Sequence, residues 1–79
     1  MRLDKYLKVS RLIKRRTVAN EASSGGRVTV NGAPAKPSKD IKPGDVIEIQ
    51  FGARAVRVEV LSVNETANKA EAPAMYREL

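Results

Sequence analysis

Basic side chains gather in the first sixteen residues, and they are the groups in this sequence whose types and spacing could do chemistry. Seven lysines and arginines stand there against a single acid, Asp4, which gives a local net charge of +6, equal to the formal net charge of the whole chain. The remainder carries eight basic and eight acidic residues. A charge of one sign confined to one end of a small domain is typical of a polyanion-binding surface. The candidate binding residues are Arg2, Lys5, Lys8, Arg11, Lys14, Arg15 and Arg16.

The adjacent pair Arg15 and Arg16 is suited to gripping phosphate. Guanidinium groups bind phosphate oxygens through two parallel hydrogen bonds, which a lysine cannot do. The pair also precedes a predicted helix, whose free backbone N–H groups and dipole favour an anion. The competing interpretation is an ordinary solvated face. It is disfavoured because the charge has one sign and only Asp4, near Lys8, offers an acid at helical spacing.

Composition argues against an enzyme. The chain has no cysteine and no histidine, so disulfides, zinc sites of the usual kind and imidazole-based catalysis are excluded. The carboxylates are scattered on predicted turns and outward strand positions, with no pair suggesting acid–base work. We therefore expect no catalytic residues, no metal and no cofactor. Apolar runs reach only three residues, too short for a membrane span, so we expect a cytoplasmic protein.

Two helices are predicted at the N-terminal end. Leu3, Tyr6 and Leu7 recur at helical spacing, with Ser10 completing the buried stripe. The stripe is interrupted over residues 10–16, which predicts a break. A second helix over residues 17–24 should end at Gly25-Gly26, because a glycine can take the left-handed conformation that terminates a helix. Its expected inward residues are Val18, Ala19 and Ala22.

The rest of the chain predicts strands. Val28 and Val30 alternate with polar residues, and Asn31-Gly32 is a strong hairpin turn signal. Residues 33–40 should form an irregular extended return. A strand over 46–51 should place Ile47, Ile49 and Phe51 on one face, a strand over 56–63 should follow, and residues 69–79 should form a short helix that docks Met75, Tyr76 or Leu79. The fold class is α+β: two helices packed on a small, curved antiparallel sheet.

Three single features each allow two interpretations. Tyr6 could stack on a base, but its place on the apolar stripe favours the core. Asp4 could orient a neighbouring arginine, although an acid in the first turn of a helix already has a default role toward the helix dipole. Gly25-Gly26 could be taken for a phosphate loop, yet no strand precedes it and no Lys-Ser/Thr follows, so the glycines are structural.

The polyanion is best interpreted as structured RNA. Two helices joined by a short connection also occur in DNA readers, whose recognition helix offers polar side chains to base edges. The second helix here offers few such groups, which favours recognition of shape and phosphates. Two alternatives stay open: a ribosome-assembly or tRNA-binding accessory, and a protein-interaction module for an acidic partner. A membrane surface is disfavoured because no large aromatic face accompanies the charge.

Four segments in order, R-L-D-K-Y-L, K-R-R-T-V-A, G-G-R-V-T-V-N-G and K-P-G-D-V-I, resemble the S4 RNA-binding domain. The likeness covers roughly residues 2–50, which implies an S4-like (alpha-L) fold, with residues 51–79 as a C-terminal extension of a single domain. With K-P-S-K, V-R-V-E-V and A-M-Y included, the whole chain resembles the stand-alone S4 proteins of bacterial ribosome-associated quality control, the RqcP and small heat-shock ribosome-associated protein family.

This resemblance implies a non-catalytic factor on the large ribosomal subunit. Its expected partners are 23S rRNA, P-site peptidyl-tRNA and a quality-control factor that adds a C-terminal alanine tail, with the protein itself a monomer. By position, Arg2, Arg15 and Arg16 would face the RNA, with Lys5, Lys8, Arg11 and Lys14 alongside. Further candidate contacts are Arg27, Lys36 and Lys39. Many S4 domains have Ser-Arg where this chain has Arg15-Arg16, so a serine helix cap is exchanged for a phosphate contact.

Overall fold

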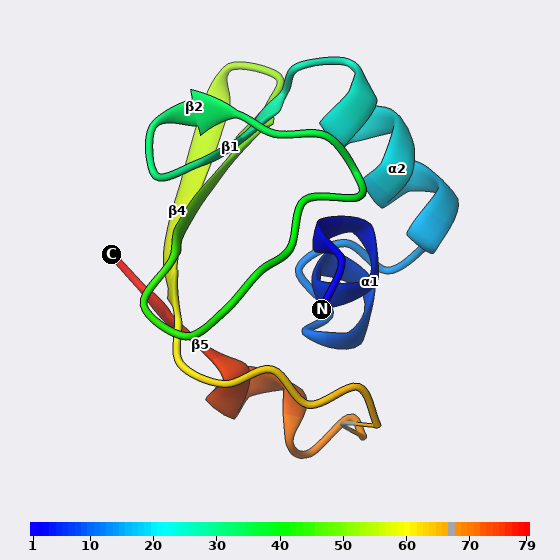
Figure 1. Ribbon diagram of the computed structural model, residues 1–79, viewed down its shortest axis with the longest axis vertical. Helices are drawn as coiled ribbons and strands as arrows, with labels where there is room; N and C mark the ends of the chain where they lie inside the picture. The colour runs from blue at the N-terminus through cyan, green and yellow to red at the C-terminus, as the bar shows by residue number, and fades with distance from the viewer. Residues whose placement is uncertain (67) are drawn as a thin grey trace.

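The computed structural model describes residues 1–66 and 68–79, so Ala67 of the predicted extension lies outside the described residues. Two helices, α1 (Leu3–Val9) and α2 (Arg16–Ser24), stand on one side of an antiparallel sheet, as Figure 1 shows. In this described part of the chain, no helix has the length and apolarity needed to cross a membrane. The predicted α+β class is confirmed.

The buried face of α1 is the predicted one, whereas that of α2 is shifted. Leu3, Tyr6 and Leu7 are fully buried in the core. On α2 the buried stripe is Ala19, Ala22 and Ser23, and the prediction that Val18 points inward is wrong, since this residue is 45% exposed. The Ser23 hydroxyl donates to the Ala19 carbonyl, which satisfies a polar side chain on the buried face. Small residues at these positions suit the packing of α2 against α1.

Both helices end in a left-handed residue, and only one of these is glycine. After α2, Gly26 has φ +78°, and the amides of Gly26 and Arg27 donate to the carbonyls of Ser23 and Ala22 in the usual C-terminal capping pattern. After α1, the corresponding residue is Arg11, with φ 63°. The helix end at the paired glycines and the break after Ser10 are therefore confirmed.

The sheet has strand order β2-β1-β3-β4-β5, and every pair is antiparallel. The strands are β1 (Val28–Val30), β2 (Ala33–Pro34), β3 (Val46–Phe51), β4 (Arg54–Val60) and β5 (Tyr76–Glu78). Asn31 and Gly32 take φ 53° and 85°, as the predicted hairpin turn requires. The expected irregular return therefore begins as a two-residue strand, β2.

One face of the sheet carries the strand half of the core. Val30 is paired with Ile47, and Ile47 with Val58, so that three buried aliphatic side chains lie across three strands. Phe51 was expected to join this face, but it is 42% exposed. It is the last residue of β3, next to the turn into β4, so it lies at the end of the strand pair rather than over the core.

The C-terminal segment differs from the predicted helix over 69–79. Residues Ala72–Met75 form one 3₁₀ turn, η1, with Pro73 at its start, and the following residues form β5 on the edge of β4. The backbone directly after β4 also hydrogen-bonds to this segment: the amides of Leu61 and Ser62 both donate to the Met75 carbonyl. Met75 is buried, as predicted, and Leu79 stays exposed.

A strap of residues 35–41 closes over the start of α1, and Figure 1 shows it running from β2 past the helix toward β3. The amides of Leu3 and Asp4 donate to the carbonyls of Lys39 and Pro37, at 2.8 and 3.1 Å. The strap therefore takes the first free N–H groups of α1 and fixes the position of this helix relative to the sheet.

Candidate nucleic-acid interface

The seven predicted basic residues lie directly before α1 (Arg2), on α1, on its connection to α2, or at the start of α2. Six of them are exposed and Lys5 is partly exposed. Arg15 is the N-cap residue of α2 and makes no side-chain capping hydrogen bond there. Arg15 therefore supplies no serine-type cap, and the phosphate contact expected in its place stays a prediction.

A buried carboxylate links the two helices within this surface. Asp4 is only 2% exposed. Its Oδ1 accepts from the Arg2 Nε at 3.2 Å, and its Oδ2 accepts from the Arg2 Nη2 at 3.3 Å. The Arg16 Nη2 lies 3.5 Å from Oδ1, and the Asn20 Nδ2 donates to Oδ2 at 3.3 Å. One side chain of α1 thus holds Arg2 and two side chains of α2.

These contacts support the alternative in which Asp4 orients a neighbouring arginine, although Asp4 also stands in the first turn of α1. Burial by itself would raise the pKa of Asp4. The hydrogen bonds from Arg2, from Asn20 and from the Lys5 amide, together with the charge of Arg16, outweigh that effect and hold the pKa below its ordinary value. Asp4 is therefore ionised at neutral pH, and it holds both guanidinium groups while about half of each arginine side chain stays exposed.

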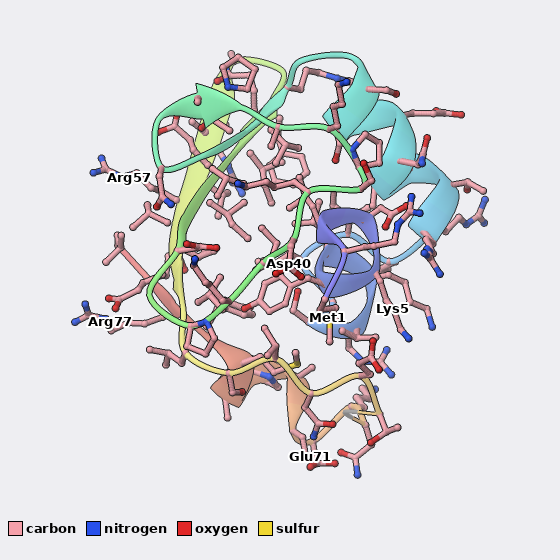
Figure 2. The ribbon with its side chains drawn as sticks, viewed as in Figure 1. Met1, Lys5, Asp40, Arg57, Glu71 and Arg77 are labelled. Carbon is pink, nitrogen blue, oxygen red and sulfur yellow. The ribbon has the colours of Figure 1, made fainter. Side chains whose placement is uncertain are left out.

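The start of the chain is fixed in the same way. The Met1 amine lies 2.8 Å from an oxygen of Asp40, and the two residues lie close together in Figure 2. Hydrogen bonding from this amine lowers the pKa of Asp40. The Ile41 amide also donates to the Met1 carbonyl at 2.7 Å. Because Met1 is held on both sides, the backbone of Arg2 has a defined position at the edge of the surface.

The remaining basic residues are less tightly held. Lys5 projects from α1 in Figure 2, and its Nζ lies 3.4 Å from the Glu65 carboxylate. Lys8, Arg11 and Lys14 line a hollow of about 110 Å³ together with Val9. The surface therefore has a preorganised part, around Asp4, and a part in which three cations surround a small depression.

The further candidates lie outside this helical surface. Lys36 and Lys39 are exposed on the strap and line a second hollow of about 320 Å³ beneath β2. Arg27 is exposed directly after α2. Since the Lys39 carbonyl accepts from the Leu3 amide, Lys39 is the member of this set that lies beside the start of α1. The structure does not bring the three residues into one cluster with the other seven.

The aromatic residue of α1 is not free to stack on a base. Tyr6 is fully buried, and its hydroxyl donates to the Met75 carbonyl at 2.8 Å, so the core interpretation is confirmed. Tyr76 is half-buried in β5. Among the described residues, no group of three or more His, Cys, Asp or Glu side chains could hold a metal ion.

Sequence reasoning did not identify Asn20 as part of the site. Asn20 belongs to α2 and reaches Asp4 only because the two helices pack side by side. The sequence signal was a polar residue one position after the buried Ala19, which by itself is typical of any solvated helix face. The link between Asp4 and Arg16 has the same origin, so no local pattern could reveal it.

Comparison with known proteins places these features in a family context. A family model for the S4 domain matches residues 1–47. The RQC P-site tRNA stabilizing factor of Bacillus subtilis (strain 168) is 54% identical over 76 residues, covering 96% of this chain and 88% of the relative. Heat shock protein 15 of Vibrio cholerae, solved as a trimer, superimposes with a TM-score of 0.92 at 35% identity, over 100% of this chain and 81% of that one. The solution structure of hypothetical protein HP1423 gives 0.84 at 28% identity, over 100% and 96%.

Proposed function

Since this chain belongs to the S4 domain family, and there to the RQC P-site tRNA stabilizing factors, we propose that it binds the large ribosomal subunit and stabilises P-site tRNA during ribosome-associated quality control. The role is non-catalytic, cytoplasmic and ribosome-associated. The observation that carries the proposal is the exposed basic surface of α1, the connection and the start of α2, in which a buried Asp4 holds Arg2 and Arg16.

The finer parts of the proposal concern the partners. The basic surface contacts 23S rRNA and peptidyl-tRNA together, and the bound protein supports alanine tailing by a separate quality-control factor. The protein acts as a monomer of one domain over residues 1–79, with the RNA-binding motif at about 2–50 and an extension over 51–79. The residues that contact RNA are Arg2, Lys5, Lys8, Arg11, Lys14, Arg15 and Arg16, with Arg27, Lys36 and Lys39 as additional contacts.

Physical chemistry favours phosphate and shape recognition over base reading at this surface. Arginines and lysines bind phosphate oxygens through charge-assisted hydrogen bonds, which position a protein on RNA without reading its sequence. Preorganisation of Arg2 and Arg16 by Asp4 reduces the side-chain entropy lost on binding. A factor that stabilises a tRNA of any sequence needs this kind of recognition.

The test is binding of the purified protein to large ribosomal subunits with and without P-site tRNA. We expect tighter binding when tRNA is present, and we expect Arg16→Ala to weaken it by about 1.5–3 kcal/mol where the lost contact is desolvated. The melting temperature should change little, because the buried Asp4 carboxylate keeps its hydrogen bonds from Arg2, Asn20 and the Lys5 amide when Arg16 is removed. Arg57→Ala is the matched control, since Arg57 projects on the opposite side of the molecule from Lys5 in Figure 2.

Two results would contradict the proposal in different ways. Equal affinity for subunits with and without tRNA would favour an assembly accessory over a tRNA-stabilising factor. Equal weakening by Arg16→Ala and by Arg57→Ala would show that net charge, and not this surface, determines binding.

A further inference from the structure

The end of α1 contains an arginine in a backbone conformation that favours glycine. Arg11 is the first residue beyond the C-cap Ser10 and has φ 63°. Gly26 occupies the same position after α2, with φ +78°. Left-handed backbone is unfavourable for residues with a side chain, and glycine avoids that strain. The chain thus keeps a side chain, and the backbone strain that goes with it, at the end of one helix, where the other helix ends in glycine.

Arg11 lies among other cationic side chains. Its neighbours around the 110 Å³ hollow are Lys8, Lys14 and Val9, so three cationic side chains border one depression. The ion pairs of the described chain involve the N-terminal amine, Arg2, Lys5, Arg16 and Arg77, and none of the three cations at the hollow. Ligand pockets for drug-sized molecules are about 300–1,000 Å³, so this hollow suits a single small anionic group.

A helix C-terminus normally repels anions, because its last carbonyl groups carry partial negative charge. Here the carbonyls of Tyr6, Leu7 and Lys8 already accept hydrogen bonds. The Ser10 amide donates to Tyr6, the Arg11 amide donates to Lys8, and the Ile13 amide donates to Leu7 at 3.0 Å. The Ser10 hydroxyl adds a second bond to the Leu7 carbonyl. The three positive charges at the hollow therefore dominate its local potential.

We propose that Lys8, Arg11 and Lys14 form a binding site for one backbone phosphate of RNA, separate from the Arg2–Arg16 pair that Asp4 holds. The proposal rests on the RNA-binding function proposed above and assigns a second, distinct contact within it. Lys8 alone has a simpler explanation, since a cation in the last turn stabilises a helix. That explanation covers neither the strained Arg11 nor Lys14, which lies beyond the helix.

The experiment compares wild type, Arg11→Gly, Lys14→Ala, Arg16→Ala and the control Arg57→Ala. Binding to large ribosomal subunits carrying P-site tRNA is measured over a range of salt, and melting temperatures are measured on the free proteins. Arg11→Gly should weaken binding about tenfold, as expected for one lost charge-assisted contact. It should also make the log–log salt dependence shallower by about 0.7–0.9. Its melting temperature should stay equal or rise by a few degrees, because glycine relieves the left-handed strain.

Each outcome bears on one claim. Wild-type protein that fails to bind subunits would overturn the proposed function itself. If wild type binds and Arg16→Ala weakens it, but Arg11→Gly behaves like Arg57→Ala, the phosphate site is wrong while the function stands. A fall in melting temperature for Arg11→Gly would show that Arg11 is kept for packing, which also contradicts the site. Lys14→Ala, in the exposed connection, should weaken binding to a similar extent, and normal binding by this variant would overturn the site even if Arg11→Gly fails to fold.

Discussion

Asp4 determines the residue-scale chemistry of the basic surface. A carboxylate that is almost fully buried must be compensated by hydrogen bonds, and here the donors are Arg2, Asn20 and the Lys5 amide, with the Arg16 guanidinium group nearby. The compensation works in both directions. The acid is stabilised in its charged form, and the two arginines are held in place while about half of each side chain stays exposed.

This arrangement predicts the effect of Asp4→Asn on stability. The new amide nitrogen would face donors from Arg2 and Asn20, so we expect a loss of about 1–3 kcal/mol at neutral pH. Because the folded-state pKa of Asp4 lies below its ordinary value of 3.8, its contribution is present above that value and is lost as pH falls through the folded-state pKa. Urea unfolding from neutral pH down to about pH 2 should show the difference between wild type and variant shrinking. A difference that stays constant with pH would contradict this role.

The same variant separates positioning from net charge. Asp4→Asn makes the chain more positive, so unspecific attraction would tighten RNA binding. We expect weaker binding, since Arg2 and Arg16 lose the acceptor that they share. Binding to large subunits that is tighter than that of the wild type would show that Asp4 plays no positioning part.

At this scale the sequence predicted which charged residues form the basic surface, but it did not predict which of them contact one another. The dipole interpretation of Asp4 was the default because first-turn acids are common and local. Its partners Arg16 and Asn20 are twelve and sixteen positions away, and only helix packing brings them together. That the predicted residues contact RNA remains a prediction.

One backbone carbonyl ties α1 to the C-terminal segment. The Met75 carbonyl, at the end of η1, accepts from the Tyr6 hydroxyl of α1 and from the amides of Leu61 and Ser62 beyond β4. The C-terminal segment therefore holds α1 at Tyr6, while the strap holds the start of α1 at Leu3 and Asp4. Since α1 carries Lys5 and Lys8 and is flanked by Arg2 and the basic connection, these two attachments keep the basic surface in one orientation relative to the sheet.

Tyr6→Phe tests this attachment. The variant removes one buried hydrogen bond, but the Met75 carbonyl keeps its two amide donors. We therefore expect a loss of only about 0.5–1.5 kcal/mol, below the cost of leaving a buried acceptor unsatisfied. Urea unfolding gives the value, with Tyr76→Phe on the same segment as the control and a smaller expected effect. A loss of unfolding free energy well above this range would mean that the amides of Leu61 and Ser62 do not keep the Met75 carbonyl satisfied in the variant.

Local signals predicted the elements that they specify directly. Asn31-Gly32 and Gly26 require positive φ, and the structure confirms both. The C-terminal helix was wrong because the alternative, β5, depends on the free edge of β4, which local propensity cannot register. Val18 was assigned to the core for the same reason, since the direction of the buried stripe on α2 is set by where α1 lies.

Across the whole molecule, charge is divided between two sides. Figure 2 shows Lys5 projecting on the side of α1, and Arg57 and Arg77 projecting beyond the sheet on the other. Arg77 is paired with Glu59, whereas the exposed residues Lys8, Arg11, Lys14 and Arg15 belong to the one-signed segment. Asp4, within that segment, offsets part of the charge of Arg2 and Arg16, and Glu65, from outside it, offsets part of the charge of Lys5. Because these acids offset part of the positive charge, we expect only about four or five phosphate contacts from the seven basic residues. Each contact neutralises one phosphate.

The most direct test of the account is the salt dependence of binding to large ribosomal subunits. Each neutralised phosphate releases counterions, so four or five contacts predict a log–log slope on the order of −3 to −4 for wild type. The double variant Arg15→Ala/Arg16→Ala should be shallower by about 1 to 2. The matched double variant Arg54→Ala/Arg57→Ala, which removes the same charge from β4, should leave the slope nearly unchanged. Equal slopes for wild type and the Arg15/Arg16 variant would mean that the N-terminal surface is only a solvated face, and would contradict the central claim.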